Sequence, residues 1–388
     1  MTNTIVLAAG PNGLGVVRSL YLNGIRSHII TRDRDDITHK SKVPTTKTYI
    51  EGTTDKEQHQ SLLSAILLSP KGTLIIPTSD WFVTFLTEHS QQLEENYKFI
   101  IPNAELSEIL IDKAKETVVV GNVIPIPKTV QEINNSQQLL DELSLPIIIK
   151  PRSHKHMVLG AKNIIIETEK QLQQFFEKFD SVLSSVIAQE IIQGKDSQQW
   201  VCNCFFDEKS NITQAFTFNR LRLSPSHYGV TSYAVSEHNQ AVIDLSAQLG
   251  KALKYTGPAM VEFKQDPVDD IYKYIEINPR LGMCNFFDTS CGINNAFATY
   301  QLATQQALPE KQSMKSGVMF VSFYEDLFSR MRDGEAVGTI LKEYLSNLAT
   351  KKHIFIYYVW WDPYPAVSLF YRQIKSFITS KLKAVFNK

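Results

Sequence analysis

Short apolar segments alternate with longer amphipathic ones over the first hundred residues. Ile5–Ala9, Ser27–Thr31 and Thr73–Ile76 have the length and apolar content of buried strands, and Gly13–Leu22 has helical spacing of its apolar positions. Strands separated by helices at this distance form parallel sheets, because each connection must cross over the sheet. The pattern predicts an α/β domain over residues 1–110.

Three glycines, Gly10, Gly13 and Gly15, lie where the first strand turns into the first helix. A helix N-terminus at this place suits either an anion or a tight turn. The order G-x-x-G-x-G differs from the dinucleotide-binding order G-x-G-x-x-G, and the Lys-Ser/Thr ending of a P-loop is missing. Both a ligand loop and a plain turn therefore stay open.

Beyond residue 110, short hairpins alternate with helices. Leu145–Pro151, Val186–Ile192 and Gln198–Phe206 are predicted strands, Val130–Leu143 is a predicted helix, and Ala259–Asn278 is a predicted hairpin. This alternation predicts α+β units built around antiparallel sheet. We expect four units, namely residues 1–110, 111–195, 196–310 and a C-terminal extension over 311–388.

The hairpin carries the strongest chemical signal. If Asp266 faces Tyr272 and Lys264 faces Tyr274, then Glu262 lies directly opposite Glu276. Like charges placed opposite each other destabilise a sheet unless a cation lies between them. Asn278 shares the face of Glu276, so two carboxylates and an amide oxygen form a hard-oxygen site suited to magnesium and phosphates. The alternative is an acidic pair in solvent, neutralised by Lys264.

Lys150 follows three isoleucines at the end of a predicted strand. Ligands collect at such strand ends in layered α/β structures, and an ammonium group suits phosphate. The commoner alternative for a single lysine is a side chain that reaches from a buried strand to solvent. The next loop is polar and basic and could fold over a triphosphate, through Ser153, His154, Lys155, His156, Gly160 and Lys162.

The segment Val186–Asp196, VIAQEIIQGKD, is an apolar strand followed by a turn. Its main-chain groups could contact the edge of an adenine, and Asp196 could accept hydrogen bonds from ribose hydroxyls. Taken by itself, the segment is only a strand and a turn.

Composition removes several classes of protein. The chain has 40 basic and 40 acidic side chains, and this zero net charge argues against a protein that coats nucleic acid. The sequence has neither a secretory signal at its start nor a run of about 18 uncharged apolar residues that would span a membrane. Four cysteines without neighbouring metal ligands are expected as reduced core thiols, which favours the cytoplasm.

Four segments together resemble the ATP-grasp superfamily. They occur in the family's order, as Asp112–Lys113, IIIKP around Lys150, QEIIQGKD, and VEF followed by EINPRLG at Glu276–Gly282. The E-x-N-P-R string is shared with biotin carboxylase and carbamoyl-phosphate synthetase relatives. Upstream, GPNGLGVVRSLYLNGI and SDWFVTFL look like the preceding domain of ATP-grasp carboligases, a group that includes D-aspartate ligase. The resemblance covers residues 1–310 and implies a Rossmann-like pre-ATP-grasp domain followed by a two-subdomain ATP-grasp fold.

The resemblance also implies cofactors and a role for each matching residue. ATP and magnesium, or manganese in its place, would be bound. The implied nucleotide contacts are Lys113 and Lys150 on phosphates, Glu190 and Ile192 at the adenine and Asp196 on the ribose. The implied metal ligands are Glu262, Glu276 and Asn278. Arg280 would stabilise an acyl phosphate or tetrahedral intermediate, and Arg222 would contact phosphate or substrate, with Arg220 as its rival.

The function implied is an ADP-forming ligase that joins a small carboxylate to an amine of an amino acid or peptide. One alternative is a carbamoyl-forming or biotin-dependent carboxylase, which shares EINPR but usually needs carrier or glutaminase partners. Another is a nucleotide-binding scaffold without catalysis, against which the retained acidic pair and Arg280 argue.

The tail predicts a basic amphipathic helix over Ala366–Phe386. After Asp362 the sequence contains no acidic residue, and apolar residues recur at helical spacing, including Val367, Phe370 and Ile374. One expectation is that this apolar stripe packs on the body of the protein. The other is that the helix lies on an anionic membrane, which would place a cytoplasmic protein at the inner face of that membrane.

Overall fold

The computed structural model describes residues 3–152, 158–161, 163–226, 229–308 and 312–386. Its N-terminal part is a parallel sheet of four strands in the order β3-β2-β1-β4. The strands are β1 Thr4–Ala8, β2 His28–Thr31, β3 Lys47–Tyr49 and β4 Leu74–Pro77. The parallel α/β arrangement predicted for residues 1–110 is confirmed, although β3 was not predicted. A strand of three residues with polar neighbours gives no apolar signal.

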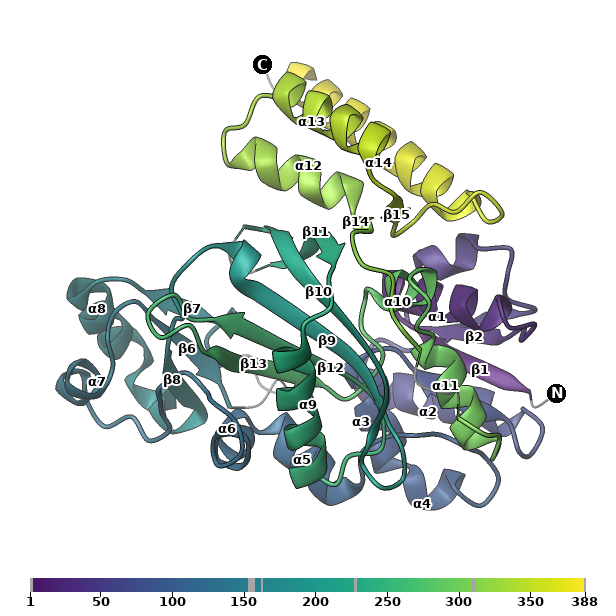
Figure 1. Ribbon diagram of the computed structural model, residues 1–388, viewed down its shortest axis with the longest axis horizontal. Coiled ribbons are helices and arrows are strands. Elements are labelled where there is room, and N and C mark those ends of the chain that lie inside the picture. Colours follow the sequence, from purple (N-terminus) through teal and green to yellow (C-terminus); the bar gives the residue numbers. More distant parts are fainter. Residues whose placement is uncertain (1–2, 153–157, 162, 227–228, 309–311, 387–388) are drawn as a thin grey trace.

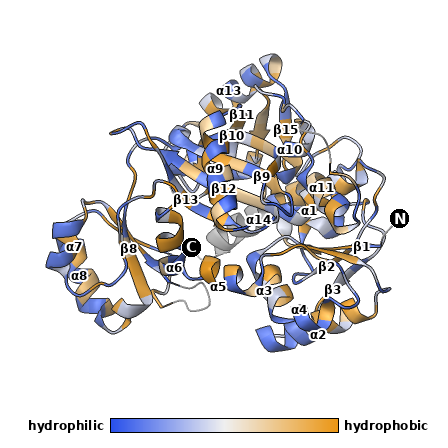
Figure 2. Cartoon of the chain, turned by 60° about the horizontal axis from the view of Figure 1, so that its bottom comes forward, coloured by the Kyte–Doolittle hydropathy of each residue, from blue (hydrophilic) through white to orange (hydrophobic). Residues whose placement is uncertain are grey.

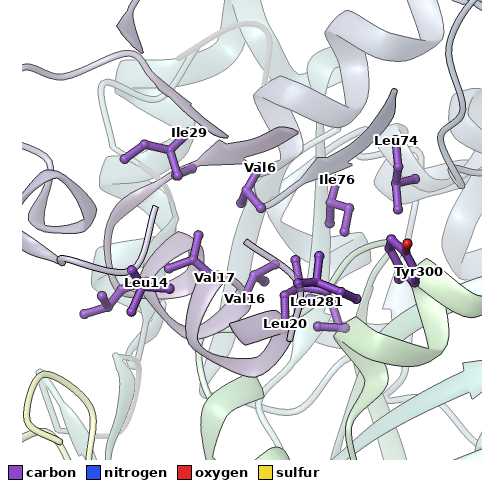
Figure 3. Packing of buried hydrophobic residues seen from close by; sticks show 14 of the residues in the cluster. Val6, Leu14, Val16, Val17, Leu20, Ile29, Leu74, Ile76, Leu281 and Tyr300 are labelled. Atoms are coloured by element: carbon purple, nitrogen blue, oxygen red, sulfur yellow. The ribbon is translucent and has the colours of Figure 1, made fainter. Parts of the chain in front are cut away.

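Both faces of this parallel sheet are covered, which explains why β1, β2 and β4 are almost wholly apolar. Helix α1, Gly10–Tyr21, packs on one face, and α2, Asp55–Leu67, and α3, Asp80–Glu88, pack on the other. In Figure 2, β1 and β2 are coloured mainly as hydrophobic. Figure 3 shows Leu281 and Tyr300, from much later in the chain, packed against this core. The N-terminal domain is therefore closely joined to the rest of the molecule.

The glycine cluster is explained by close packing of main chain. Gly10 has φ +56°, and its N–H donates to Asp36 Oδ2 at 2.6 Å. A Cβ on Gly13 would lie 2.5 Å from the Cβ of Ala8, and one on Gly15 would lie 2.5 Å from Asn285 Oδ1. The geometry favours the plain turn, because these glycines allow the first helix to approach both β1 and a later helix.

A second sheet of four antiparallel strands forms a separate lobe, with helices α7 and α8 beside it in Figure 1. Its order is β5-β8-β6-β7, with β5 Thr129–Val130, β6 Ile147–Pro151, β7 Ile164–Ile166 and β8 Val186–Glu190. The helices are α7 Ser136–Glu142 and α8 Glu169–Phe179. The predicted helix Val130–Leu143 is wrong at its start, because Thr129 and Val130 pair with β8 and Asn135 caps α7.

The largest sheet has seven strands in the order β13-β12-β9-β10-β11-β14-β15. These are β9 Gln199–Phe206, β10 Ile212–Ser224, β11 Val230–Ser236, β12 Gly257–Gln265, β13 Tyr272–Asn278, β14 Met319–Val321 and β15 His353–Phe355. Helices α5 Ala104–Ile111, α6 Lys113–Gly121 and α9 Gln240–Ala252 pack on one face. Helices α10 Asn285–Ser290 and α11 Asn295–Ala303 lie on the other. All four cysteines are buried and free, as expected for core thiols.

Residues beyond 311 add β14 and β15 to this sheet and then form the outer layer at the top of Figure 1. The layer contains α12 Phe323–Arg332, α13 Val337–Thr350 and α14 Tyr364–Phe386. Between β15 and α14 the chain contacts the N-terminal domain, where the fully buried Arg18 pairs with Asp362 at 3.0 Å. None of the helices in the described part of the chain has the length and apolar character needed to cross a bilayer.

Candidate active site

The hairpin β12–β13 brings the two predicted carboxylates together. Glu262 is the direct cross-strand partner of Glu276, and Asn278 lies opposite Met260, as the sequence predicted for the acidic pair. The rest of the predicted register is wrong. Because the register shifts between Glu262 and Phe263, Lys264 faces Lys273 and Gln265 faces Tyr272. A β-bulge of this kind adds one residue on one strand and reverses the alternation beyond it.

Arg220 neutralises the first carboxylate. It reaches from β10, two strands away, and its Nη1 and Nη2 donate to Glu262 at 2.5 and 2.6 Å, with both side chains buried. Burial alone would lower the pKa of Arg220, but the attraction of Glu262 outweighs it and raises that pKa. The idea that Lys264 neutralises the acidic pair is wrong, because its ammonium donates to the carbonyl oxygens of Ile192 and Gly194.

A chain of hydrogen bonds connects the second carboxylate to the N-terminal domain. Asn278 Nδ2 donates to Glu276 Oε1 at 3.2 Å, and Arg280 Nη2 donates to Asn278 Oδ1 at 3.0 Å. Arg280 also binds both oxygens of Asp80, at 2.8 and 3.1 Å. Asp80 is the first residue of α3, after the N-cap Ser79. The sequence analysis missed Asp80, because an acidic residue in the first turn of a helix is usual for local reasons.

Lys113 lies beside this group at the start of α6. Its ammonium pairs with Glu116 at 2.7 Å, and its main-chain N–H donates to the carbonyl of Arg152, just beyond β6. Burial would lower the pKa of Lys113, but the attraction of Glu116, Glu276 and Asp80 raises it. Lys113 is therefore held as a cation close to the acidic pair.

The remaining predicted nucleotide contacts lie on the smaller sheet. Lys150 donates to Gln189 Oε1 at 2.7 Å, which directs its ammonium along the surface of β8. The main-chain N–H of Glu190 donates to the carbonyl oxygen of Lys128, and the carbonyl oxygen of Ile192 accepts from the ammonium of Lys264. Two main-chain groups of the predicted adenine hinge thus already have hydrogen-bond partners within the protein.

Lys264 connects the hinge to the hairpin. It belongs to β12 and binds two carbonyls in the segment after β8, while Asp196 attracts it from the start of a short 3₁₀ helix. Burial lowers the pKa of Lys264, and Asp196 and Asp266 oppose that effect. Ile192 and Asp196 are thereby connected to the sheet that carries Glu262, whereas Lys150 and Glu190 stay on the smaller sheet.

Arg222 lies on the opposite face of the large sheet from Arg220. Residues two apart on a regular strand share a face, but β10 has a bulge here. Arg220 lies opposite Ala234 and Arg222 lies opposite Tyr233. Because Ala234 and Tyr233 are adjacent, β10 has one extra residue between the two arginines. Arg222 instead binds Asp326 of α12, at 2.8 and 2.9 Å. The structure does not bring Arg222 together with the other predicted residues.

The donors around the acidic pair fit a hard cation. Glu262, Glu276 and Asn278 offer only oxygen ligands, which magnesium prefers when phosphate oxygens complete its shell. In the ranges that the structure describes, His, Cys, Asp and Glu side chains form no group of three or more that could hold a metal by themselves. Of the predicted phosphate loop, residues 153–156 and Lys162 lie outside the described residues.

Comparison with known proteins gives relatives in sequence and in structure, although no family model matches the chain. D-aspartate ligase of Enterococcus faecium is 28% identical over 249 residues, which is 58% of this chain and 57% of the relative. The carbamoyl phosphate synthase large chain of Methanosarcina mazei is 24% identical over 178 residues, covering 43% of this chain and 16% of the relative. The chain thus matches little more than half the length of the first relative and much less of the second.

Two solved structures show the same fold over most of the chain. Biotin carboxylase from Campylobacter jejuni has a TM-score of 0.64 at 17% identity, covering 82% of this chain and 74% of that one. L-amino acid ligase from Bacillus licheniformis has a TM-score of 0.59 at 14% identity, covering 79% and 75%. The protein has the ATP-grasp fold, with a parallel N-terminal domain before the two sheets. Its relatives in sequence include D-aspartate ligase and carbamoyl phosphate synthase, as the motifs predicted.

Proposed function

We propose that this protein is an ATP-dependent carboxylate–amine ligase that forms an amide or peptide bond and releases ADP and phosphate. The observation that carries the proposal is the juxtaposition of Glu262 with Glu276 across one hairpin, with Asn278 and Arg280 joined to the same group. The sequence likeness to D-aspartate ligase and the fold likeness to L-amino acid ligase support an amine as the second substrate.

In this proposal the residues of the cluster bind and neutralise the charged groups of the substrates. Lys113 and Lys150 hold the phosphates of ATP, while Glu190, Ile192 and Asp196 hold the adenine and ribose. Magnesium, held by Glu262, Glu276 and Asn278, would neutralise charge on the phosphate oxygens. Transfer of the γ-phosphoryl group makes the carboxylate a good electrophile, and Arg280 stabilises the oxyanion that forms when the amine attacks. Closure around the site would exclude water from the acyl phosphate.

Binding of a cation requires the present contacts of the acidic pair to change. Glu262 is held by two hydrogen bonds from Arg220, and Glu276 is hydrogen-bonded to Asn278. A divalent cation between the carboxylates would replace part of this compensation, and Arg220 would then be free to turn toward a phosphate oxygen. Arg220, and not Arg222, is the arginine of β10 in our proposed site.

A carbamoyl-forming or biotin-dependent reaction is the second candidate, and the fold likeness to biotin carboxylase favours it. The distinction lies in the acceptor. A ligase consumes ATP only with an amine acceptor, whereas a carboxylase consumes it with bicarbonate. We further propose the cytoplasm as the place of the reaction, because ATP is supplied there.

The test measures ADP release by the full chain with ATP and magnesium, in three parallel reactions. One contains a panel of amino acids and dipeptides, one contains bicarbonate alone, and one contains neither. The proposal expects ADP release only in the first, in equal amount with a new amide detected by mass spectrometry. ADP release that needs bicarbonate and no amine would support the carboxylase. Magnesium-dependent ATP binding without turnover in any reaction would support a scaffold. The folded Glu276→Gln variant is the background control.

A further inference from the structure

Helix α14 turns an apolar stripe toward solvent. The exposed fractions are 61% for Tyr364, 59% for Val367, 55% for Phe370, 68% for Tyr371 and 40% for Ile374. Residues spaced by three and four lie on one face of a helix. The expectation that Val367, Phe370 and Ile374 pack on the body of the protein is therefore wrong.

The other face of α14 holds the helix to the protein. Leu369 is only 8% exposed and belongs to the core cluster that contains Ile37 and Val43 of the N-terminal domain. Arg372 Nη1 donates to the carbonyl of Asp35 in the same domain. The apolar stripe is consequently presented by a docked helix and not by a detached one.

Two aromatic side chains shortly before the helix are also exposed. Trp360 is 80% exposed and Tyr358 is 49% exposed, and both precede Tyr364 in the chain. Tyrosine and tryptophan are enriched where proteins meet the boundary between lipid and water, because their rings are apolar and their polar groups can stay hydrated.

The C-terminal layer has a higher proportion of basic side chains than the rest of the molecule. Residues 311–388 contain twelve basic and six acidic side chains, whereas the whole chain has 40 of each. Four of those six acids pair with arginines, namely Asp326, Glu335, Glu343 and Asp362. The segment after Asp362 has no acidic residue and carries Arg372, Lys375, Lys381, Lys383 and Lys388. Arg372 and Lys375 are exposed on the same part of α14 as the apolar stripe.

We infer that α14, which begins at Tyr364, docks together with Trp360 on an anionic lipid surface. Apolar side chains enter the boundary of the bilayer and neighbouring basic residues attract its headgroups, which is how amphipathic helices lie on membranes. A second copy of the chain fits less well, because two segments of the same positive charge would face each other. In Figure 1 the layer with α13 and α14 lies apart from β13.

The test is co-sedimentation of the full chain with vesicles of phosphatidylcholine alone or mixed with phosphatidylglycerol. The double variant Phe370→Glu/Ile374→Glu changes two exposed positions. The matched control is Leu68→Glu/Val268→Glu, which changes two other exposed apolar residues, 89% and 86% exposed. Circular dichroism checks that both variants are folded.

The wild type and the control are expected to bind the anionic vesicles about tenfold more tightly than the neutral ones, with binding that weakens as salt is added. The α14 variant is expected to lose about tenfold or more of that binding. Wild type that stays in the supernatant at low salt, or an α14 variant that binds as the control does, overturns the inference. Light scattering without vesicles supplies another outcome. If the wild type is a dimer and the α14 variant a monomer, a second copy is the occupant and the lipid surface is rejected.

Discussion

Strand β10 supplies one arginine to each of two charge clusters on opposite faces of the same sheet. Arg220 binds Glu262 beside Glu276, where the other predicted active-site residues meet. Arg222 binds Asp326, which also accepts from Ser232 and Tyr344, and so fixes the C-terminal layer to the sheet. Both arginines form two hydrogen bonds to one buried carboxylate, and burial lowers the pKa of each while the paired acid raises it.

The difference lies in what surrounds each pair. In the cluster at Arg222, each carboxylate pairs with an arginine: Asp326 with Arg222, and Glu343 with both Arg222 and Arg330. The cluster at Arg220 places two carboxylates opposite each other, which costs stability unless cations compensate. Repulsion between charges that a bound ligand would relieve is typical of a functional site. Charges that are already paired within the protein contribute to stability instead.

The largest expected effect is on catalysis. Lys150→Ala and Glu276→Gln each remove a charge that we assign to ATP or its cation, so ATP turnover should fall by a factor of about 10²–10³. The matched control is Glu343→Gln, which changes an acid of the other cluster and should leave turnover per folded molecule unchanged. ADP release is the measurement. Turnover close to wild type in folded Glu276→Gln would remove the acidic pair from the active site.

The second prediction separates the two arginines. Arg220→Gln and Arg222→Gln each leave a buried carboxylate without its cation, which costs about 3–5 kcal/mol of unfolding free energy, and less for Arg222 because Ser232 and Tyr344 remain. Urea denaturation measures this cost. Only Arg220→Gln should also lose turnover in the fraction that stays folded. If the folded Arg222 variant were the inactive one, our assignment of the two clusters would be reversed.

These two arginines also show which parts of the site can be predicted from the sequence. The opposition of Glu262 and Glu276 was predicted from a turn register that is one residue off, and the bulge between Glu262 and Phe263 cancels that offset. The choice between Arg220 and Arg222 depends on a bulge within β10, which leaves no mark in the hydrophobic pattern. In both places one inserted residue, which the alternation of the sequence does not reveal, decides which side chains meet.

Contacts between segments distant in sequence are a second feature that the sequence does not predict. Asp80 meets Arg280 across 200 positions of sequence, and Arg18 meets Asp362 across 344. Neither pair has a periodic signal, because long-range pairing depends on how the domains pack. The parallel N-terminal sheet, in contrast, was predictable, since its strands are buried on both faces and are apolar throughout.

The third prediction concerns the connection from Arg280 to the N-terminal domain. Asp80→Asn keeps the side-chain shape and removes the charge that orients Arg280, so kcat/KM should fall by about tenfold through misplacement of that arginine. Asp244→Asn is the control, because Asp244 is an exposed acid of α9 that accepts a hydrogen bond from Gln240 of the same helix. Equal kinetics for the two variants would show that Asp80 has no part in positioning.

The smallest effect concerns a third buried acid, Asp288 of α10. Its carboxylate accepts from the amides of Asn203, at 2.8 Å, and Asn295, at 3.5 Å. Burial raises the pKa of Asp288 to about 8, and these hydrogen bonds oppose the rise only in part. Glu262 differs in its partner, since it accepts from an arginine, whereas Asp288 accepts from two amides and is protonated at neutral pH.

The sign of the resulting pH dependence follows from this shift. Because the pKa is higher in the folded chain than in the unfolded one, the folded state holds an extra proton between about pH 4 and pH 8. Unfolding free energy should therefore fall as pH rises through that window, by about 1 kcal/mol per pH unit near neutrality, and level off above it. Asp288→Asn cannot ionise, so its urea midpoint should change less than that of wild type between about pH 6.5 and 7.5. Parallel curves for the two proteins would mean that Asp288 is already ionised in the fold, and the contrast between the arginine-bound and amide-bound acids would be lost.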